Sequence, residues 1–140
     1  MSGDVRTMNI VRLDGVVVKW KPVGKERANA SKLHKEAVSD LRTIFGHPMI
    51  LEECRIEIDA GKHVYFDIYL PQFNLFVEIN GEQHYRFNPH FHKNPMDFMR
   101  QKRRDNEKLQ WCRLNNFPIA SLPYNKREEW PEIIRQSLSD

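Results

Sequence analysis

Cysteine is scarce in this chain: among its 140 residues only Cys54 and Cys112 carry a thiol, and they lie far apart in sequence. A cysteine-based zinc finger needs more thiolate ligands than this, so the count excludes that class. The chain also shows no signal peptide and no transmembrane run. One disulfide is an open alternative, but we expect reduced, buried thiols in a cytoplasmic protein that does not contact a membrane.

A strong net charge is lacking too. The formal charge is only +3 at pH 7, although charged residues make up 29% of the chain. Any affinity for nucleic acid must therefore come from local clustering. Such a cluster exists in the positions 100–108, where acidic Asp105 and Glu107 dilute the cations Arg100, Lys102, Arg103, Arg104 and Lys108.

Internal repeats and low-complexity tracts are absent, and the length suits one domain with a substantial core. Asp14-Gly15 predicts a two-residue hairpin turn within 8–20. Ser31 and Asn94-Pro95 are helix N-terminal signals, which predict helices at 31–45 and 94–115. Strands are expected at 48–58, 64–70, 75–80 and 117–124, and a last helix at 127–138. We therefore predict a single α/β domain, a central mixed sheet flanked by the two longer helices.

The central prediction is a hairpin over 64–80 whose loop is Pro71 to Asn74. This register places Leu70 opposite Leu75 and Asp67 opposite Glu78. Alternation along the strands then predicts two faces. One face is apolar and holds Phe66, Ile68, Leu70, Leu75, Val77 and Ile79; the other holds Tyr65, Asp67, Tyr69, Phe76, Glu78 and Asn80.

Two like charges placed directly opposite each other destabilise a sheet. Asp67 and Glu78 therefore need protonation of one of them, a paired cation, or a divalent metal between them. The plainer alternative is a wrong register with both acids on a solvated face. An Asp and a Glu on adjacent strands suit Mg²⁺ bound to a substrate phosphate, and phosphodiester hydrolysis is the reaction that such a site serves.

Polar residues on the flanking helices offer partners for these acids. His34 falls on the edge of the first helix's apolar stripe, where it is either a satisfied core residue or aimed at the sheet's carboxylates. On the second helix, Phe98, Lys102, Asp105, Leu109 and Cys112 share a narrow arc, whereas Arg100, Arg103, Arg104 and Glu107 point away. Lys102 and Asp105 either pair with each other or reach the carboxylates.

The segment from His84 to Lys93 is rich in imidazoles and aromatic rings. His84, His90 and His92 suit a transition metal, but structural or DNA-contacting roles are stronger expectations. Tyr85, Phe87 and Phe91 suit stacking on unpaired bases.

Several ordered strings resemble a known family, the PD-(D/E)xK nucleases. They are similar to small phage-type and homing-type endonucleases near the very short patch repair enzymes. The likeness covers about Ser31 to Tyr124, between an N-terminal hairpin and linker (1–30) and a C-terminal helix (125–140). Its strings are Phe66-Asp-Ile-Tyr-Leu-Pro71, Val77-Glu-Ile-Asn-Gly-Glu-Gln-His-Tyr85, Gln101-Lys-x-x-Asp-x-x-Lys108 and Ser121-Leu-Pro-Tyr124.

The resemblance implies a restriction-endonuclease-like core in which Asp67 and Glu78 bind Mg²⁺ or Mn²⁺. Gln83 falls in a string that the subgroup keeps, and His34 lies where relatives carry a glutamate. The departure is Asn80, which stands where a lysine is usual and cannot act as an ammonium. Lys102 from the helix, or Gln83, would then replace that lysine.

These expectations describe a metal-dependent DNA endonuclease of a bacterial or phage-infected cell. Its backbone contacts are expected from the segment 84–93 and the second helix, through His84, Tyr85, Arg86, His90, His92, Lys93, Arg100, Arg103, Arg104 and Lys108. The alternatives are a nuclease-fold DNA-binding module with weak or no activity, and an RNA endonuclease. A monomer would nick one strand, whereas double-strand cleavage would require a homodimer.

Overall fold

The structure, a computed structural model, describes residues 5–24, 30–82, 86–90 and 92–139. Its elements in chain order are β1 (Met8–Val11), β2 (Val17–Trp20), α1 (Lys32–Phe45), β3 (Leu51–Asp59), β4 (Lys62–Leu70), β5 (Leu75–Asn80), α2 (Pro95–Leu114), β6 (Ile119–Pro123), the 3₁₀ helix η2 (Arg127–Glu129) and α3 (Trp130–Leu138).

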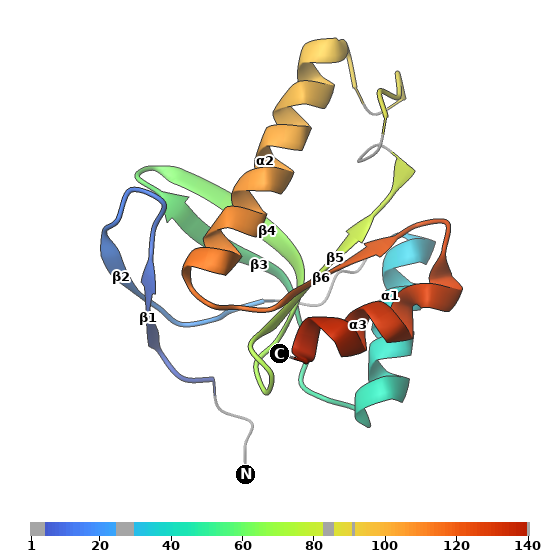
Figure 1. The fold of residues 1–140 in the computed structure, drawn as a ribbon, viewed down its shortest axis with the longest axis horizontal. Helices are drawn as coiled ribbons and strands as arrows, with labels where there is room; N and C mark the ends of the chain where they lie inside the picture. Colours follow the sequence, from blue (N-terminus) through green and yellow to red (C-terminus); the bar gives the residue numbers. More distant parts are fainter. Residues whose placement is uncertain (1–4, 25–29, 83–85, 91, 140) are drawn as a thin grey trace.

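The main sheet has four strands in the order β3-β4-β5-β6. Strands β3, β4 and β5 are antiparallel, and β6 runs parallel to β5 after the crossover through α2. Helix α2 lies on one side of this sheet, and α1 and α3 lie on the other (Figure 1). The predicted α/β class, a mixed sheet flanked by helices, is therefore confirmed.

Two apolar layers hold the helices on the sheet. The layer under α1 and α3 joins Ala37, Val38 and Leu41 of α1 to Trp130 and Ile134 of α3 across the apolar residues of β4, β5 and β6. The layer under α2 is aromatic: it contains Phe66, Tyr69, Phe76 and Trp111, together with Trp20 from the separate hairpin β1-β2. Each large buried side chain contributes about 1.5–3 kcal/mol by leaving water, which makes these layers the main source of stability.

The predicted register of the central hairpin is confirmed, since Leu70 pairs with Leu75, Tyr69 with Phe76 and Ile68 with Val77. The predicted faces are partly wrong. Phe66 lies in the layer under α2 with Phe76, whereas Ile68 lies in the layer under α1. The ribbon of β3 and β4 therefore changes face at Asp67. On β3, Glu53 has the left-handed φ of 52° at the same level, between Glu52 and Cys54, which pair with Ile68 and Phe66.

Helix ends follow the predicted signals closely. The Ser31 side chain accepts a hydrogen bond from the His34 N–H at 3.1 Å, and Gly46 ends α1 with a φ of 68°. The Asn94 side chain likewise caps α2 through the Asp97 N–H. Ile44, in the last turn of α1, is exposed.

The N-terminal hairpin forms, but its turn differs from the two-residue turn predicted at Asp14-Gly15. Val11 pairs with Val17, so the loop is Arg12 to Val16. Arg12 holds it by donating to Asp14 and to Glu57 of β3. A side chain that bridges to the main sheet thus favours the longer loop.

Both cysteines are buried and unbridged, as expected. Burial raises the pKa of the Cys54 thiol to about 12, so it stays protonated at neutral pH. Among the helices of the described residues, none has the length and apolar character needed to cross a bilayer.

Candidate functional site

The candidate site lies where β4 and β5 separate. Backbone pairing ends at Ile68 and Val77, and the two predicted acids take over the next positions. The Asp67 N–H donates to Glu78 Oε2 at 2.7 Å, and the Ile79 N–H donates to Asp67 Oδ2 at 2.9 Å. Each carboxylate therefore accepts a backbone N–H of the neighbouring strand. The juxtaposition predicted from the register is confirmed, and the strands are held apart by the acids themselves.

Glu78 is the buried member of this pair, with only 6% of its surface exposed. Its Oε1 accepts a hydrogen bond from Lys108 Nζ at 2.8 Å, and that ammonium also lies over the ring of Phe66. Burial and, secondarily, the charge of Asp67 raise the pKa of Glu78 to about 7, although Lys108 opposes the shift. Of the three resolutions foreseen for two facing acids, the structure contains a paired cation.

Lys108 corrects the sequence-based prediction in two ways. It was expected to contact DNA phosphates, but its side chain is only 14% exposed and pairs with Glu78. Lys102 or Gln83 was expected to replace the missing lysine, whereas the lysine that pairs with Glu78 is Lys108. The spacing did contain the signal: Lys108 lies four residues before buried Cys112, and residues four apart share a helix face.

A cavity of about 180 Å³ lies beside Glu78, between α2 and the sheet. Asn80, Ser121 and Ile119 line it from the strands, and Lys102, Asp105, Lys108 and Leu109 line it from α2. Lys102 and Asp105 thus line the same cavity as Glu78. The cavity brings oxygen, amide and ammonium groups around one polar space.

The donor chemistry of this site fits a hard dication. Mg²⁺ takes oxygen ligands and is commonly bound by one or two carboxylates with water and substrate phosphate completing its shell. Asp67 and Glu78 supply two carboxylates, and Asn80 adds an amide oxygen nearby. Among the described residues, no group of three or more His, Cys, Asp or Glu side chains is arranged for a metal ion.

His34 does not reach these acids. Its buried ring lies 2.6 Å from Glu52 Oε1, measured from Nε2, and this pair joins α1 to β3. His34 is therefore a satisfied core residue, the first of the two readings given above. The sequence analysis missed Glu52. A glutamate near the end of a strand is expected to face solvent unless the helix that packs on it is known.

The segment before α2 gives a mixed outcome. Gln83, His84, Tyr85 and Phe91 lie outside the described residues. His92 is buried: its Nδ1 accepts from the Asn88 N–H and its Nε2 lies 2.8 Å from Gln101 Oε1. Both ring nitrogens are engaged within the protein, so His92 fits the structural alternative and not the metal-ligand or DNA-contact alternatives.

The remaining predicted DNA contacts are on the surface. Arg86, His90, Lys93, Arg103 and Arg104 are exposed, as is Arg100, which pairs with Asp97 at 2.8 Å. Glu107 was expected to point away from the sheet, but it pairs with Lys62 of β4. The arginines of α2 therefore form an exposed basic face on the helix that roofs the cavity.

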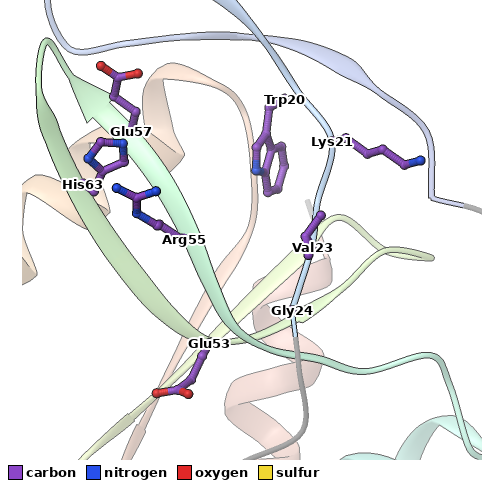
Figure 2. Close-up of a pocket in the computed structure, with 8 residues that line it drawn as sticks. All are labelled: Trp20, Lys21, Val23, Gly24, Glu53, Arg55, Glu57 and His63. Carbon is purple, nitrogen blue, oxygen red and sulfur yellow. The ribbon is translucent and has the colours of Figure 1, made fainter.

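A separate hollow of about 450 Å³ lies at the bend of β3, under the segment from Trp20 to Gly24 (Figure 2). Arg55 and His63 lie side by side on the ribbon, facing Trp20 and Val23 across the hollow (Figure 2). Gly24 packs directly on β3, where an added Cβ would lie 2.6 Å from the Glu52 carbonyl oxygen. No residue predicted for the nuclease site lines this hollow.

Two viral proteins match part of the chain. It is 41% identical over 75 residues to the uncharacterized protein 307L of invertebrate iridescent virus 6, a match that covers 51% of the chain and 38% of the relative. It is 39% identical over 65 residues to the uncharacterized protein 033L of invertebrate iridescent virus 3, covering 46% and 34%. The chain thus matches only about a third of each relative's length. No family model and no solved structure matches it.

Proposed function

We propose that this chain is a divalent-metal-dependent DNA endonuclease with a restriction-endonuclease-like core and Mg²⁺ or Mn²⁺ as its cofactor. The observation that carries the proposal is the acid pair at the separation of β4 and β5. Glu78 is buried beside Asp67, with Lys108 Nζ 2.8 Å from Glu78 Oε1. Two like charges held together destabilise the sheet, and a bound dication would offset this repulsion.

The surroundings of the pair support the same reaction. The cavity beside Glu78 is open to a substrate group between α2 and the sheet. The exposed arginines of α2 lie on the helix that forms its roof. Backbone phosphates bound by these arginines would hold a nucleic acid strand along the outer face of α2. The mixed sheet between helices is the architecture that the resemblance implies.

Each residue then has a chemical role. Asp67 and Glu78 hold the ion, since carboxylate oxygens are the ligands that hard dications prefer. When bound, such an ion polarises a phosphoryl oxygen, lowers the pKa of an attacking water and stabilises the leaving oxygen. Lys108 neutralises Glu78 and, on a flexible stem, supplies the ammonium that Asn80 cannot. Asn80 contributes a neutral amide that orients water or phosphate by hydrogen bonds.

A DNA-binding module without cleavage is the second candidate, and one observation favours it. Both Glu78 oxygens are already engaged, one by Lys108 and one by the Asp67 N–H. An ion would have to compete with the ammonium for Glu78 Oε1. If Lys108 excludes a metal ion from Glu78, the protein would bind DNA without cleaving it.

A nicking assay separates the two candidates. Plasmid, branched and single-stranded DNA, and RNA as a separate substrate, are incubated with the protein and Mg²⁺ or Mn²⁺. We expect cleavage of DNA by the wild type and none by Asp67→Ala. Lys108→Met should slow cleavage by about 100-fold or more, as for loss of one preorganised electrostatic group. Lys62→Met, which removes another lysine ion pair between the sheet and α2, serves as the matched control and should cut normally.

No cleavage by the wild type on any substrate, with DNA binding retained, would leave the binding module as the function. Cleavage of RNA alone would replace the DNA endonuclease by an RNA endonuclease. Equal losses in Lys108→Met and Lys62→Met would mean that Lys108 only holds α2 on the sheet.

A further inference from the structure

Another hollow lies beyond the ends of β5 and β6. Its volume is about 360 Å³, and its walls are Arg86, Pro123, Tyr124, Asn125, Lys126 and Glu129. Ligand pockets in proteins have volumes of about 300–1,000 Å³. The hollow is therefore large enough for one nucleoside-sized group.

The hollow and the cavity beside Glu78 are lined by nearby positions of β6. Ser121 lines that cavity and Pro123 lines the hollow. These residues are two apart on β6, so they face the same side and lie about 7 Å apart. Asn80, which lines the cavity, also accepts a hydrogen bond at its carbonyl oxygen from the Tyr124 N–H at 2.9 Å. A strand with a phosphate at Glu78 would thus meet the hollow with its neighbouring nucleotide.

The groups on the walls suit a nucleotide. Lys126 is exposed, and within the described part of the chain its ammonium has no hydrogen-bond or ion-pair partner. Arg86 is exposed and reaches Glu82 only at 3.4 Å. Both side chains can donate hydrogen bonds to phosphate oxygens. Asn125 and Glu129 are exposed too, and amide and carboxylate groups hydrogen-bond the edges of bases. Tyr124 adds an aromatic wall of the kind on which bases stack.

We propose that this hollow binds an unpaired nucleotide of the substrate strand, next to the phosphate that is cut. A base inside a duplex is stacked on both faces and paired along its edge, so it can enter such a hollow only when unpaired or flipped out. The substrate class is then DNA with a single-stranded portion at the cut, such as a flap or a gap. The position relative to the cut rests on the proposed function, but the binding itself can be measured alone.

The test is fluorescence anisotropy in EDTA, where no cleavage occurs, with a short labelled single strand and a fully paired duplex of the same sequence. Tyr124→Leu should weaken binding of the single strand by about 5- to 100-fold, the range for loss of one stacked base. Duplex affinity should stay within about twofold. Tyr124→Phe keeps the ring and should bind as the wild type does.

Lys126→Ala provides an independent variant, because this exposed residue can change without disturbing the fold. It should weaken single-strand binding severalfold. Lys35→Ala on α1, also exposed, is the matched control and should change nothing. Unchanged single-strand binding in both Tyr124→Leu and Lys126→Ala, or losses that are equal for duplex and single strand, would overturn the proposal.

Cleavage assays keep this inference apart from the proposed function. If the wild type cuts no DNA but Tyr124→Leu still loses single-strand binding, the endonuclease proposal fails and the hollow stands. If the wild type cuts and Tyr124→Leu both binds and cuts as the wild type does, the hollow is overturned and the endonuclease stands.

Discussion

Glu78 is a buried carboxyl group, and opposing influences act on its protonation. Burial and the neighbouring charge of Asp67 favour its protonated form, while Lys108 and the Asp67 N–H favour the carboxylate. The balance raises the pKa of Glu78 to about 7. A group poised at this pH responds to any cation that enters the site, because added positive charge favours ionisation.

The raised pKa predicts a pH-dependent stability. In the unfolded chain Glu78 titrates near its usual value of about 4.3, whereas the folded group titrates near 7. Between these values the folded protein binds more protons, so the free energy of unfolding falls as pH rises and levels off above about 7. The slope from this group is at most about 1.4 kcal/mol per pH unit. Urea unfolding at pH 5 and pH 8 measures it.

Glu78→Gln should flatten this slope. The variant leaves Lys108 unpaired, but the cost of a buried ammonium is similar at both pH values and cancels from the comparison. Glu128→Gln, a change to an exposed glutamate of η2, should keep the wild-type slope. A wild type that gains stability from pH 5 to pH 8, with the same gain in Glu78→Gln, would contradict the assignment.

At the scale of elements, signals that act locally were readable from the sequence. Ser31 and Asn94 capped their helices, and the register of the central hairpin followed from alternation and loop length. This was enough to bring Asp67 and Glu78 together. What could not be read was the change of face at Asp67, because a bend in a ribbon depends on which helix covers each half. The same limit hid the His34–Glu52 pair and the pairing of Lys108 with Glu78.

The segment from Trp20 to Gly24 packs on the β3-β4 ribbon at its bend. Gly24 packs against the backbone of β3, and an added Cβ would lie 2.6 Å and 2.8 Å from the oxygen and nitrogen of Glu52. Backbone atoms cannot turn aside as a side chain can. Gly24→Ala should therefore lower the free energy of unfolding by about 1–3 kcal/mol, the usual cost of overpacking. Urea unfolding measures it.

The neighbouring residue gives the control for this prediction. Val23 is 68% exposed, so Val23→Ala should change stability by less than about 0.5 kcal/mol. Comparable stability of Gly24→Ala and the wild type would mean that the segment is free to lift from β3.

For the whole molecule, the proposed binding of DNA has to be reconciled with a formal charge of only +3. We expect the distribution of exposed cations to be asymmetric. Helix α2 carries exposed Arg100, Arg103 and Arg104 on the side of the sheet where the cavity opens, while α3 lies on the opposite side (Figure 1). Affinity for DNA should then depend on one face, and cations elsewhere should contribute little.

Salt dependence tests this asymmetry. Each phosphate neutralised by a cation contributes about −0.9 to the slope of log affinity against log salt for duplex DNA. The double variant Arg103→Ala/Arg104→Ala should make that slope shallower by about 1.8 if each arginine neutralises one phosphate. Arg135→Ala on α3, which removes a cation paired with Glu132, should leave the slope unchanged. The double variant loses two cations and the control loses one, so a change in slope for Arg135→Ala that is half that of the double variant would mean that DNA is attracted by net charge and not by the α2 face.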